Sequence, residues 1–114
     1  MAEKYSQAAL DDLEAAIGKD GLGRVLSAFI GELKDNRPNF VDFGDSLDLD
    51  QLCRHAHTLK STAGTFGAVA LQDAARQMEE ATRLEQVEKA LELQPSVLAL
   101  LDETIAYYSK TFDS

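Results

Sequence analysis

The sequence predicts an all-α protein, folded as an antiparallel, up-down four-helix bundle with a short additional N-terminal helix. Ala, Leu, Glu and Gln are abundant, whereas the chain has two prolines and no tryptophan. Hydrophobic residues recur at helical spacing in the central segments. The connections between these segments are short, which favours antiparallel neighbours. The length of 114 residues predicts a single domain over residues 1–114.

The first two helices have recognisable limits. We expect one from about Ser6 to Ile17, with Ser6 as its N-cap and the sequence "GKDG" as its stop. A second begins near Asp20 and carries a hydrophobic stripe that includes Leu26 and Phe29. It then meets Pro38, which either kinks this helix or ends it.

Three further helices complete the expected bundle. One runs from about Asp48 to Thr65 and the next from about Ala68 to Arg83. The last reaches about Phe112. It either starts near Glu85 and runs through Pro95, or starts at Pro95 as its first residue.

Composition limits the classes of partner. Eleven Lys and Arg face twenty Asp and Glu, so the formal net charge is -9. A surface this negative repels nucleic acid and anionic lipid, so we expect protein partners, no nucleic acid, no membrane and a monomer. Cys53 is the only cysteine, which excludes an internal disulfide. Without a signal peptide or a hydrophobic run of the ~20 residues that span a bilayer, the expected location is the cytoplasm.

The helix predicted over residues 48–65 holds both histidines of the chain. Its core-facing positions recur at steps of three and four, and they are Leu49, Leu52, Ala56, Leu59, Ala63 and Phe66. His57 lies off this seam, on the face of Cys53, Lys60, Ser61 and Gly64, so we expect its side chain at the surface. His55 is rotated by roughly 200° from His57, and the two cannot act on one ligand.

The face around His57 suits phosphoryl chemistry. Imidazole, with a reference pKa of about 6.5, is largely neutral near pH 7, so a ring nitrogen can attack an electrophile without a separate base. Lys60 could stabilise the charge on phosphoryl oxygens. Gly64 costs ~1 kcal/mol relative to Ala inside a helix, which close approach of a partner would explain. The alternative is that Gly64 only begins a helix end that Gly67 completes.

Residues 56–79, "AHTLKSTAGTFGAVALQDAARQME", resemble the histidine-containing phosphotransfer (HPt) domain of bacterial multistep phosphorelays. In that family a phosphorylatable histidine is followed by Leu and Lys two and three positions later. Small residues and a Gly-Ala pair come after the Lys. The sequence differs in having Ser61 where many members have Gly, and Ala63 and Ala75 in place of a frequent Ser and Cys. The matching positions are His57, Leu59, Lys60, the run 61–64, Gly67, Ala68, Leu71, Met78 and Glu79.

The resemblance implies a protein that accepts a phosphoryl group on His57 from a receiver-domain aspartate and passes it to another receiver. Lys60 would steady the phosphoryl group, and Cys53, Ser61 and Gly64 would form the docking surface. The implied partners are response-regulator receiver domains and a hybrid histidine kinase. The receiver would supply Mg²⁺, so no metal or cofactor is expected here. The chain shows no Gly-rich nucleotide loop, and we expect a carrier rather than an enzyme. A free-standing module and a domain excised from a longer sensor kinase would look the same.

Two alternatives remain from the residues themselves. Asp50, Cys53 and His57 fall at i, i+3 and i+7 and could ligate a divalent ion, although Lys60 would lie beside that cation and no fourth ligand is evident. The second alternative is a helical interaction module that binds receivers or kinases without carrying phosphate. The presence of a nucleophile with a cation beside it argues against a purely binding surface.

Overall fold

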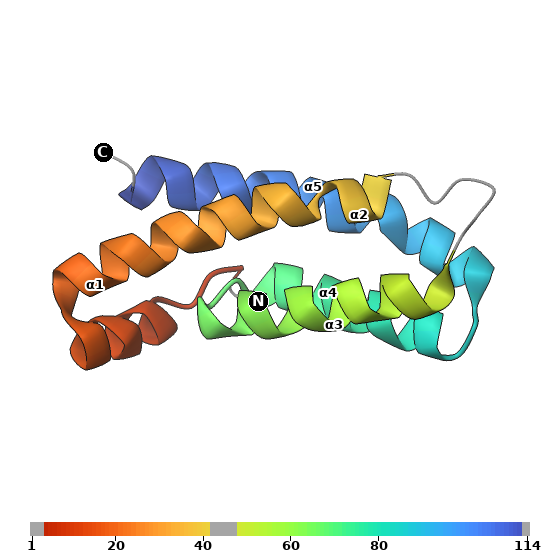
Figure 1. Ribbon diagram of the computed structural model, residues 1–114, viewed down its shortest axis with the longest axis horizontal. Helices are drawn as coiled ribbons and strands as arrows, with labels where there is room; N and C mark the ends of the chain where they lie inside the picture. The colour runs from red at the N-terminus through yellow and green to blue at the C-terminus, as the bar shows by residue number, and fades with distance from the viewer. Residues whose placement is uncertain (1–3, 42–47, 113–114) are drawn as a thin grey trace.

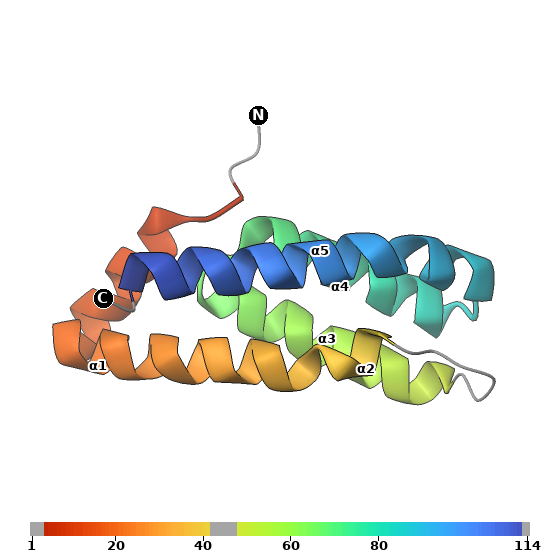
Figure 2. The ribbon, with the colours of Figure 1, turned by 90° about the horizontal axis from the view of Figure 1, so that it is seen from above.

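The computed structural model describes residues 4–41 and 48–112, and within these ranges the regular elements are helices, with no strand. The main body is a bundle in which successive long helices alternate in direction (Figures 1 and 2). The predicted all-α, up-down bundle is therefore confirmed. The helices are α1 (Gln7–Asn36), α2 (Pro38–Val41), α3 (Leu49–Thr65), α4 (Val69–Arg83) and α5 (Val87–Phe112).

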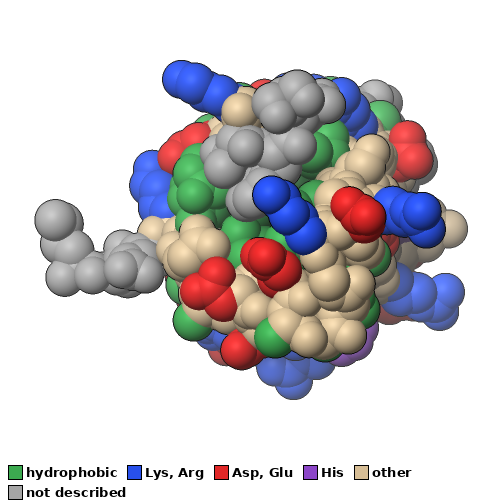
Figure 3. Space-filling view, turned by 90° about the vertical axis from the view of Figure 1, so that its left-hand side faces the viewer, with side chains coloured by type: hydrophobic (Ala, Val, Ile, Leu, Met, Phe, Trp, Pro, Cys, Tyr) green, Lys and Arg blue, Asp and Glu red, His purple; other side chains and the backbone are tan. Residues whose placement is uncertain are grey.

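A kink divides α1 into the two helices that the sequence predicts. Gly18 has φ 80° and ψ 169°, a left-handed conformation that glycine adopts readily. The part over 7–17 is the short N-terminal helix, and its N-cap Ser6 accepts a hydrogen bond from the Ala9 amide. This part lies across one end of the bundle (Figure 1). That end shows hydrophobic side chains in patches between acidic and basic ones (Figure 3).

The core is formed by one hydrophobic face from each long helix. α3 packs most extensively against α4, and α4 in turn packs against α5. Alanines on the two facing surfaces, such as Ala56, Ala63 and Ala75, are fully buried and let the α3 and α4 backbones approach closely. The largest fully buried side chains include Leu26, Phe29, Leu33, Leu59, Leu71, Met78, Leu101 and Tyr108.

The two prolines have different outcomes. α1 ends at Asn36, and Pro38 begins the short α2, where its missing amide proton costs no helical hydrogen bond. Pro95 lies inside α5, which starts at Val87 and continues through it. Beside Pro95, the side-chain amide of Gln94 donates to the carbonyls of Phe40 (2.9 Å) and Val41 (2.6 Å). These bonds join the end of α2 to α5.

The turn between α3 and α4 fixes the start of α4 relative to the end of α3. Gly67 has φ +77°, and its carbonyl accepts a hydrogen bond from the Ser6 amide at 2.7 Å. A Cβ at Gly67 would meet the Ser6 carbonyl oxygen, so both its conformation and the close approach require glycine. Gly64 lies in the last turn of α3 without a positive φ. The left-handed residue of this helix end is therefore Gly67.

None of the helices in residues 4–41 and 48–112 is both long enough and hydrophobic enough to cross a membrane.

Candidate functional site

The N-terminus of α3 sets the faces that the helix presents. The Asp48 carboxylate accepts a hydrogen bond from the Gln51 amide at 3.1 Å and caps the first turn. Of the predicted seam, the four central residues are buried, and Leu49 and Phe66 at its ends are half-buried. His57 lies off this seam with 64% of its side chain exposed, as the helical spacing predicts. His55 is half-buried.

A carboxylate from α4 joins two of the residues singled out on α3. Glu79 Oε2 lies 2.5 Å from His57 Nδ1, and Glu79 Oε1 accepts a hydrogen bond from Lys60 Nζ at 2.6 Å. Only 18% of the Glu79 side chain is exposed, and Lys60 is itself half-buried. The site is therefore a three-residue network across the α3–α4 pair.

This network selects one tautomer of the neutral histidine ring. The hydrogen bond from Lys60 lowers the pKa of Glu79, burial opposes this shift, and the hydrogen bond with His57 lowers the pKa further. Glu79 is thus an ionised carboxylate, which can only accept hydrogen bonds. In the neutral ring of His57 the proton must then lie on Nδ1, and the lone pair on Nε2.

Hydrogen bonds to its backbone also fix the position of Glu79. Its backbone carbonyl accepts hydrogen bonds from the hydroxyl of Thr82 at 2.9 Å and from the thiol of Cys53 at 3.7 Å. Thr82 is buried and also donates to the carbonyl of Met78 at 2.8 Å. Cys53 is half-buried between the two helices, so it contacts the backbone that carries Glu79.

The other predicted docking residues lie beyond Lys60 on the same helix. Ser61 is exposed and Gly64 is half-buried. A Cβ at Gly64 would meet the terminal amide of Gln72, a flexible side chain of α4 that lies over the glycine. The structure thus gives Gly64 an internal neighbour that the sequence did not reveal.

An open cavity of about 750 Å³ runs beside His57 between α3 and α4. Asp50, Cys53 and His57, the alternative metal ligands, all line it, but no group of three His, Cys, Asp or Glu in the described ranges is arranged to hold a metal ion. The full lining is Asp50, Cys53, Arg54, His57, Thr58, Glu79, Thr82, Arg83 and Glu85.

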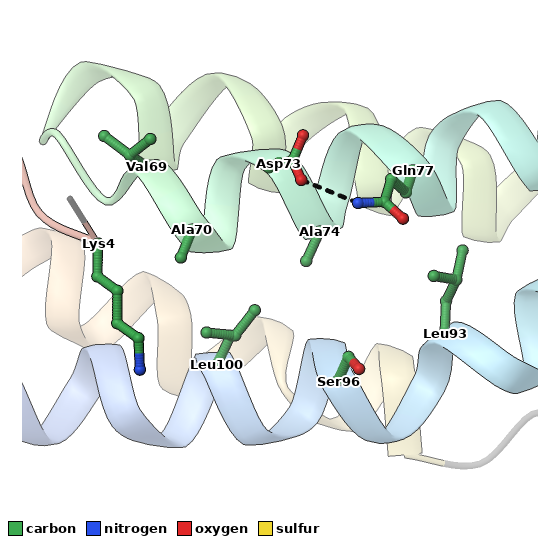
Figure 4. A pocket seen from close by; sticks show the side chains of 9 residues that line it. All are labelled: Lys4, Val69, Ala70, Asp73, Ala74, Gln77, Leu93, Ser96 and Leu100. Atoms are coloured by element: carbon green, nitrogen blue, oxygen red, sulfur yellow. Dashed lines mark hydrogen bonds between the residues drawn. The ribbon is translucent and has the colours of Figure 1, made fainter. Parts of the chain in front are cut away.

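A second cavity, of about 560 Å³, lies between α4 and α5 and holds no comparable chemistry (Figure 4). Its floor is mainly hydrophobic, and within its lining the side-chain amide of Gln77 donates a hydrogen bond to Asp73 at 2.9 Å. It is lined by Lys4, Val69, Ala70, Asp73, Ala74, Gln77, Leu93, Ser96 and Leu100, with no histidine or cysteine. The α3–α4 face is therefore the stronger candidate.

Sequence reasoning placed Glu79 only within the family resemblance and missed its contacts. One signal could have found it. If α3 and α4 form a hairpin about Ala68, His57 and Glu79 are equally distant in sequence from the turn and meet across it.

Comparison with known proteins gives one family. The Hpt domain model matches residues 4–109 of the chain. The phosphorelay protein LuxU of Vibrio cholerae serotype O1 is 31% identical over 110 residues, which cover 96% of each chain. The phosphorelay protein LuxU of Vibrio harveyi is 29% identical over 99 residues, or 87% of each chain. No solved structure matches. With a helical bundle and a match over nearly its whole length, the chain belongs to the Hpt domain family.

Proposed function

We propose that this Hpt phosphotransfer protein carries its phosphoryl group on Nε2 of His57. The observation that carries the proposal is the bond between Glu79 and Nδ1 of an exposed histidine ring. This bond occupies one nitrogen and leaves the other with its lone pair in reach of solvent. His55 has no such partner among the hydrogen bonds of the described residues.

The transfer step needs no proton acceptor. Nε2 of His57 attacks the phosphorus of an aspartyl phosphate on a receiver domain, and the N–P bond forms as the bond from phosphorus to the carboxylate oxygen breaks. The electron pair of that bond stays on the aspartate. The Nδ1 proton stays in place, and the ionised Glu79 stabilises the positive charge that the ring acquires. The reverse step passes the group to a second receiver.

We propose that Lys60 stabilises the negative charge of the phosphoryl group during transfer. Its ammonium lies one helical turn beyond His57 and is fixed by Glu79 at 2.6 Å. A cation held there would stabilise the phosphoryl oxygens without rearranging during the reaction. We propose Ser61 and Gly64 as part of the receiver-docking surface beyond Lys60, and Cys53 on its other side.

Hpt domains relay phosphoryl groups between kinases and receiver domains, and the chain is such an intermediate rather than an enzyme in the usual sense. We propose response-regulator receivers and a hybrid histidine kinase as its partners, with Mg²⁺ supplied by the receiver. Because kinases draw on cytoplasmic ATP, we place this exchange in the cytoplasm. We also propose that the protein works as a monomeric, single-domain module.

The test compares the two histidines. The protein is incubated with a panel of radiolabelled, phosphorylated receivers, and acid-labile label on the chain is measured. We expect His57→Gln to abolish labelling with its helical content and melting temperature nearly unchanged, because the side chain is exposed. The matched control His55→Gln should keep transfer. Labelling that survives His57→Gln, or an unlabelled wild-type protein that still binds receivers, would contradict the proposal.

A further inference from the structure

We infer that Arg54 and Arg83 bind the acidic rim of a receiver's phosphorylation site and thereby decide which receivers exchange phosphate with His57. The inference rests on the proposed function of His57 and adds the residues that select its partner. Both arginines line the 750 Å³ cavity beside His57. Arg54 lies one turn before His57 on α3, and Arg83 lies one turn beyond Glu79 on α4.

Lys60 does not supply the positive charge that would bind the acidic rim of a receiver. Lys60 and Glu79 form an ion pair at 2.6 Å, so the positive charge of Lys60 is met within the protein. A phosphoryl group brings about -1.5 to -2 charges to the site. Any further negative charge on a partner must therefore be met by cations other than Lys60.

Arg54 and Arg83 are available for that role. Several other cations of the described residues are committed to carboxylates, namely Lys4 to Glu103, Arg37 to Asp102, and Arg76 to Asp73 and Glu80. Neither Arg54 nor Arg83 forms an ion pair or a side-chain hydrogen bond within residues 4–41 and 48–112. Two uncommitted guanidinium groups thus lie on one side of the proposed nucleophile.

The partner's chemistry explains why cations are needed there. A receiver that uses Mg²⁺ at its aspartate must supply oxygen ligands, chiefly carboxylates, around the reacting group. The present chain has a net charge of -9, so the two proteins repel each other unless the contact face is locally positive. A guanidinium group can bind a carboxylate through two parallel hydrogen bonds, which makes the contact directional as well as attractive.

The same cavity carries a second, opposite feature. Asp50 lies one turn before Arg54, further from His57, and Glu85 follows the end of α4. Because Lys60 offsets the charge of Glu79, the cavity is basic beside His57 and acidic at its outer end. A receiver with carboxylates next to its phosphate and a cation further out fits this pattern. A receiver with carboxylates in both places meets like charge, which lowers its affinity.

The experiment uses the receiver that transfers fastest in the panel described above. Arg54→Ala and Arg83→Ala are expected to raise KM roughly 10-fold each, and the double variant about 100-fold, with a smaller change in kcat. The dependence of kcat/KM on NaCl concentration should become shallower. Arg54→Lys and Arg83→Lys should recover part of the loss, because the charge remains without the planar fork. The matched control is Arg24→Ala, an exposed arginine of α1.

A second donor separates docking from chemistry. Phosphoramidate phosphorylates histidine without any protein surface, so the arginine variants should lose much more receiver-dependent transfer than phosphoramidate-dependent labelling. Equal losses with both donors, or KM values and salt dependence like those of Arg24→Ala, would overturn the inference. In either case labelling of wild-type His57 would leave the proposed function standing, whereas unlabelled wild-type protein would remove both.

Discussion

The two carboxylate oxygens of Glu79 bind different groups, the imidazole of His57 and the ammonium of Lys60. One oxygen holds the Nδ1 proton of His57 and the other holds the ammonium of Lys60. The hydrogen bond from Lys60 is the largest contribution that lowers the pKa of Glu79. Lys60 therefore acts twice in the proposed reaction, by placing positive charge near the phosphoryl group and by keeping Glu79 ionised.

Lys60→Ala tests this double role. We expect phosphoryl transfer to His57 to slow by roughly 10- to 1000-fold, the range seen when one preorganised electrostatic contact is lost. Residual activity should remain, because the nucleophile and Glu79 are still present. Single-turnover transfer from a phosphorylated receiver gives the rate. A rate equal to that of the wild type would mean that Lys60 takes no part in the reaction.

The contact between His57 and Glu79 also marks the limit of sequence reasoning about the site. The exposure of His57 and its face shared with Lys60 follow from spacing within one helix. The partner of the ring depends on the rotation of α4 about its own axis. That rotation is set by the alanines packed between the helices, Ala56, Ala63 and Ala75, and by the Gly67 turn. A pattern within one helix does not contain this information.

The hairpin of α3 and α4 depends on one glycine more than on the other. Gly67 needs a positive φ and lies against the Ser6 carbonyl, whereas Gly64 has ordinary helical geometry and faces a movable side chain, Gln72. The sequence offered two explanations for Gly64, as an opening for a partner or as part of the helix end. The left-handed position belongs to Gly67, which leaves the docking role of Gly64 as a proposal.

Substitution of the two glycines by alanine should separate these roles. Gly67→Ala is expected to lower the free energy of unfolding by more than ~1 kcal/mol, because it adds a strained φ and a backbone collision. Gly64→Ala should keep or slightly raise stability, since alanine favours helix and Gln72 can move. Thermal melts of both variants provide the comparison. Greater destabilisation by Gly64→Ala than by Gly67→Ala would contradict the assignment.

The helix limits could be predicted wherever a local cap or stop exists. The capping residue Asp48 and the Gly67 turn bound α3, and Gly18 separates the first two helices, close to the expected positions. The fate of the prolines could not be predicted in the same way. Whether a helix continues through Pro95 depends on contacts from elsewhere, such as those of Gln94 with the carbonyls of α2.

The bundle measures 44 × 26 × 21 Å, and His57 lies near the middle of α3, so a partner must approach its long side. Within residues 4–41 and 48–112, three carboxylates have pKa values below their ordinary range. The hydrogen bond from Lys60 is the main cause of the lowered pKa of Glu79, and the one from Arg37 is the main cause for Asp102. The pKa of Asp73 is lowered by hydrogen bonds from Arg76 and Gln77. Asp102 and Asp73 are largely exposed, so solvent screening leaves them small contributions to stability.

Acid should therefore destabilise the fold. A folded-state pKa below the unfolded value means that the unfolded chain binds protons more readily. The stabilisation is complete above the ordinary carboxyl pKa values of 3.8 and 4.5 and is lost as pH falls through the lower folded-state values. Urea unfolding between pH 7 and pH 3 measures this loss.

The control for this measurement is Glu79→Gln, which removes one of the three carboxylates. It should be less stable than the wild type at pH 7 and should lose less stability on acidification. The difference between the two proteins isolates Glu79 from the general loss of negative charge. Parallel pH profiles would show that Glu79 contributes nothing to the acid sensitivity.

The residues proposed to react, to orient and to select all lie on α3 and α4, two helices that are consecutive in the chain. The gene segment for this hairpin can thus be inherited or transplanted as one piece. Its exchange between related bundles would change the nucleophile's surroundings and its choice of partner together. Mutations at the exposed positions of α5, by contrast, can accumulate as long as its buried residues and the contacts of Gln94 with α2 are kept. Related proteins of this kind can thus change their partners through substitutions in the α3–α4 segment alone, while the rest of the sequence varies independently.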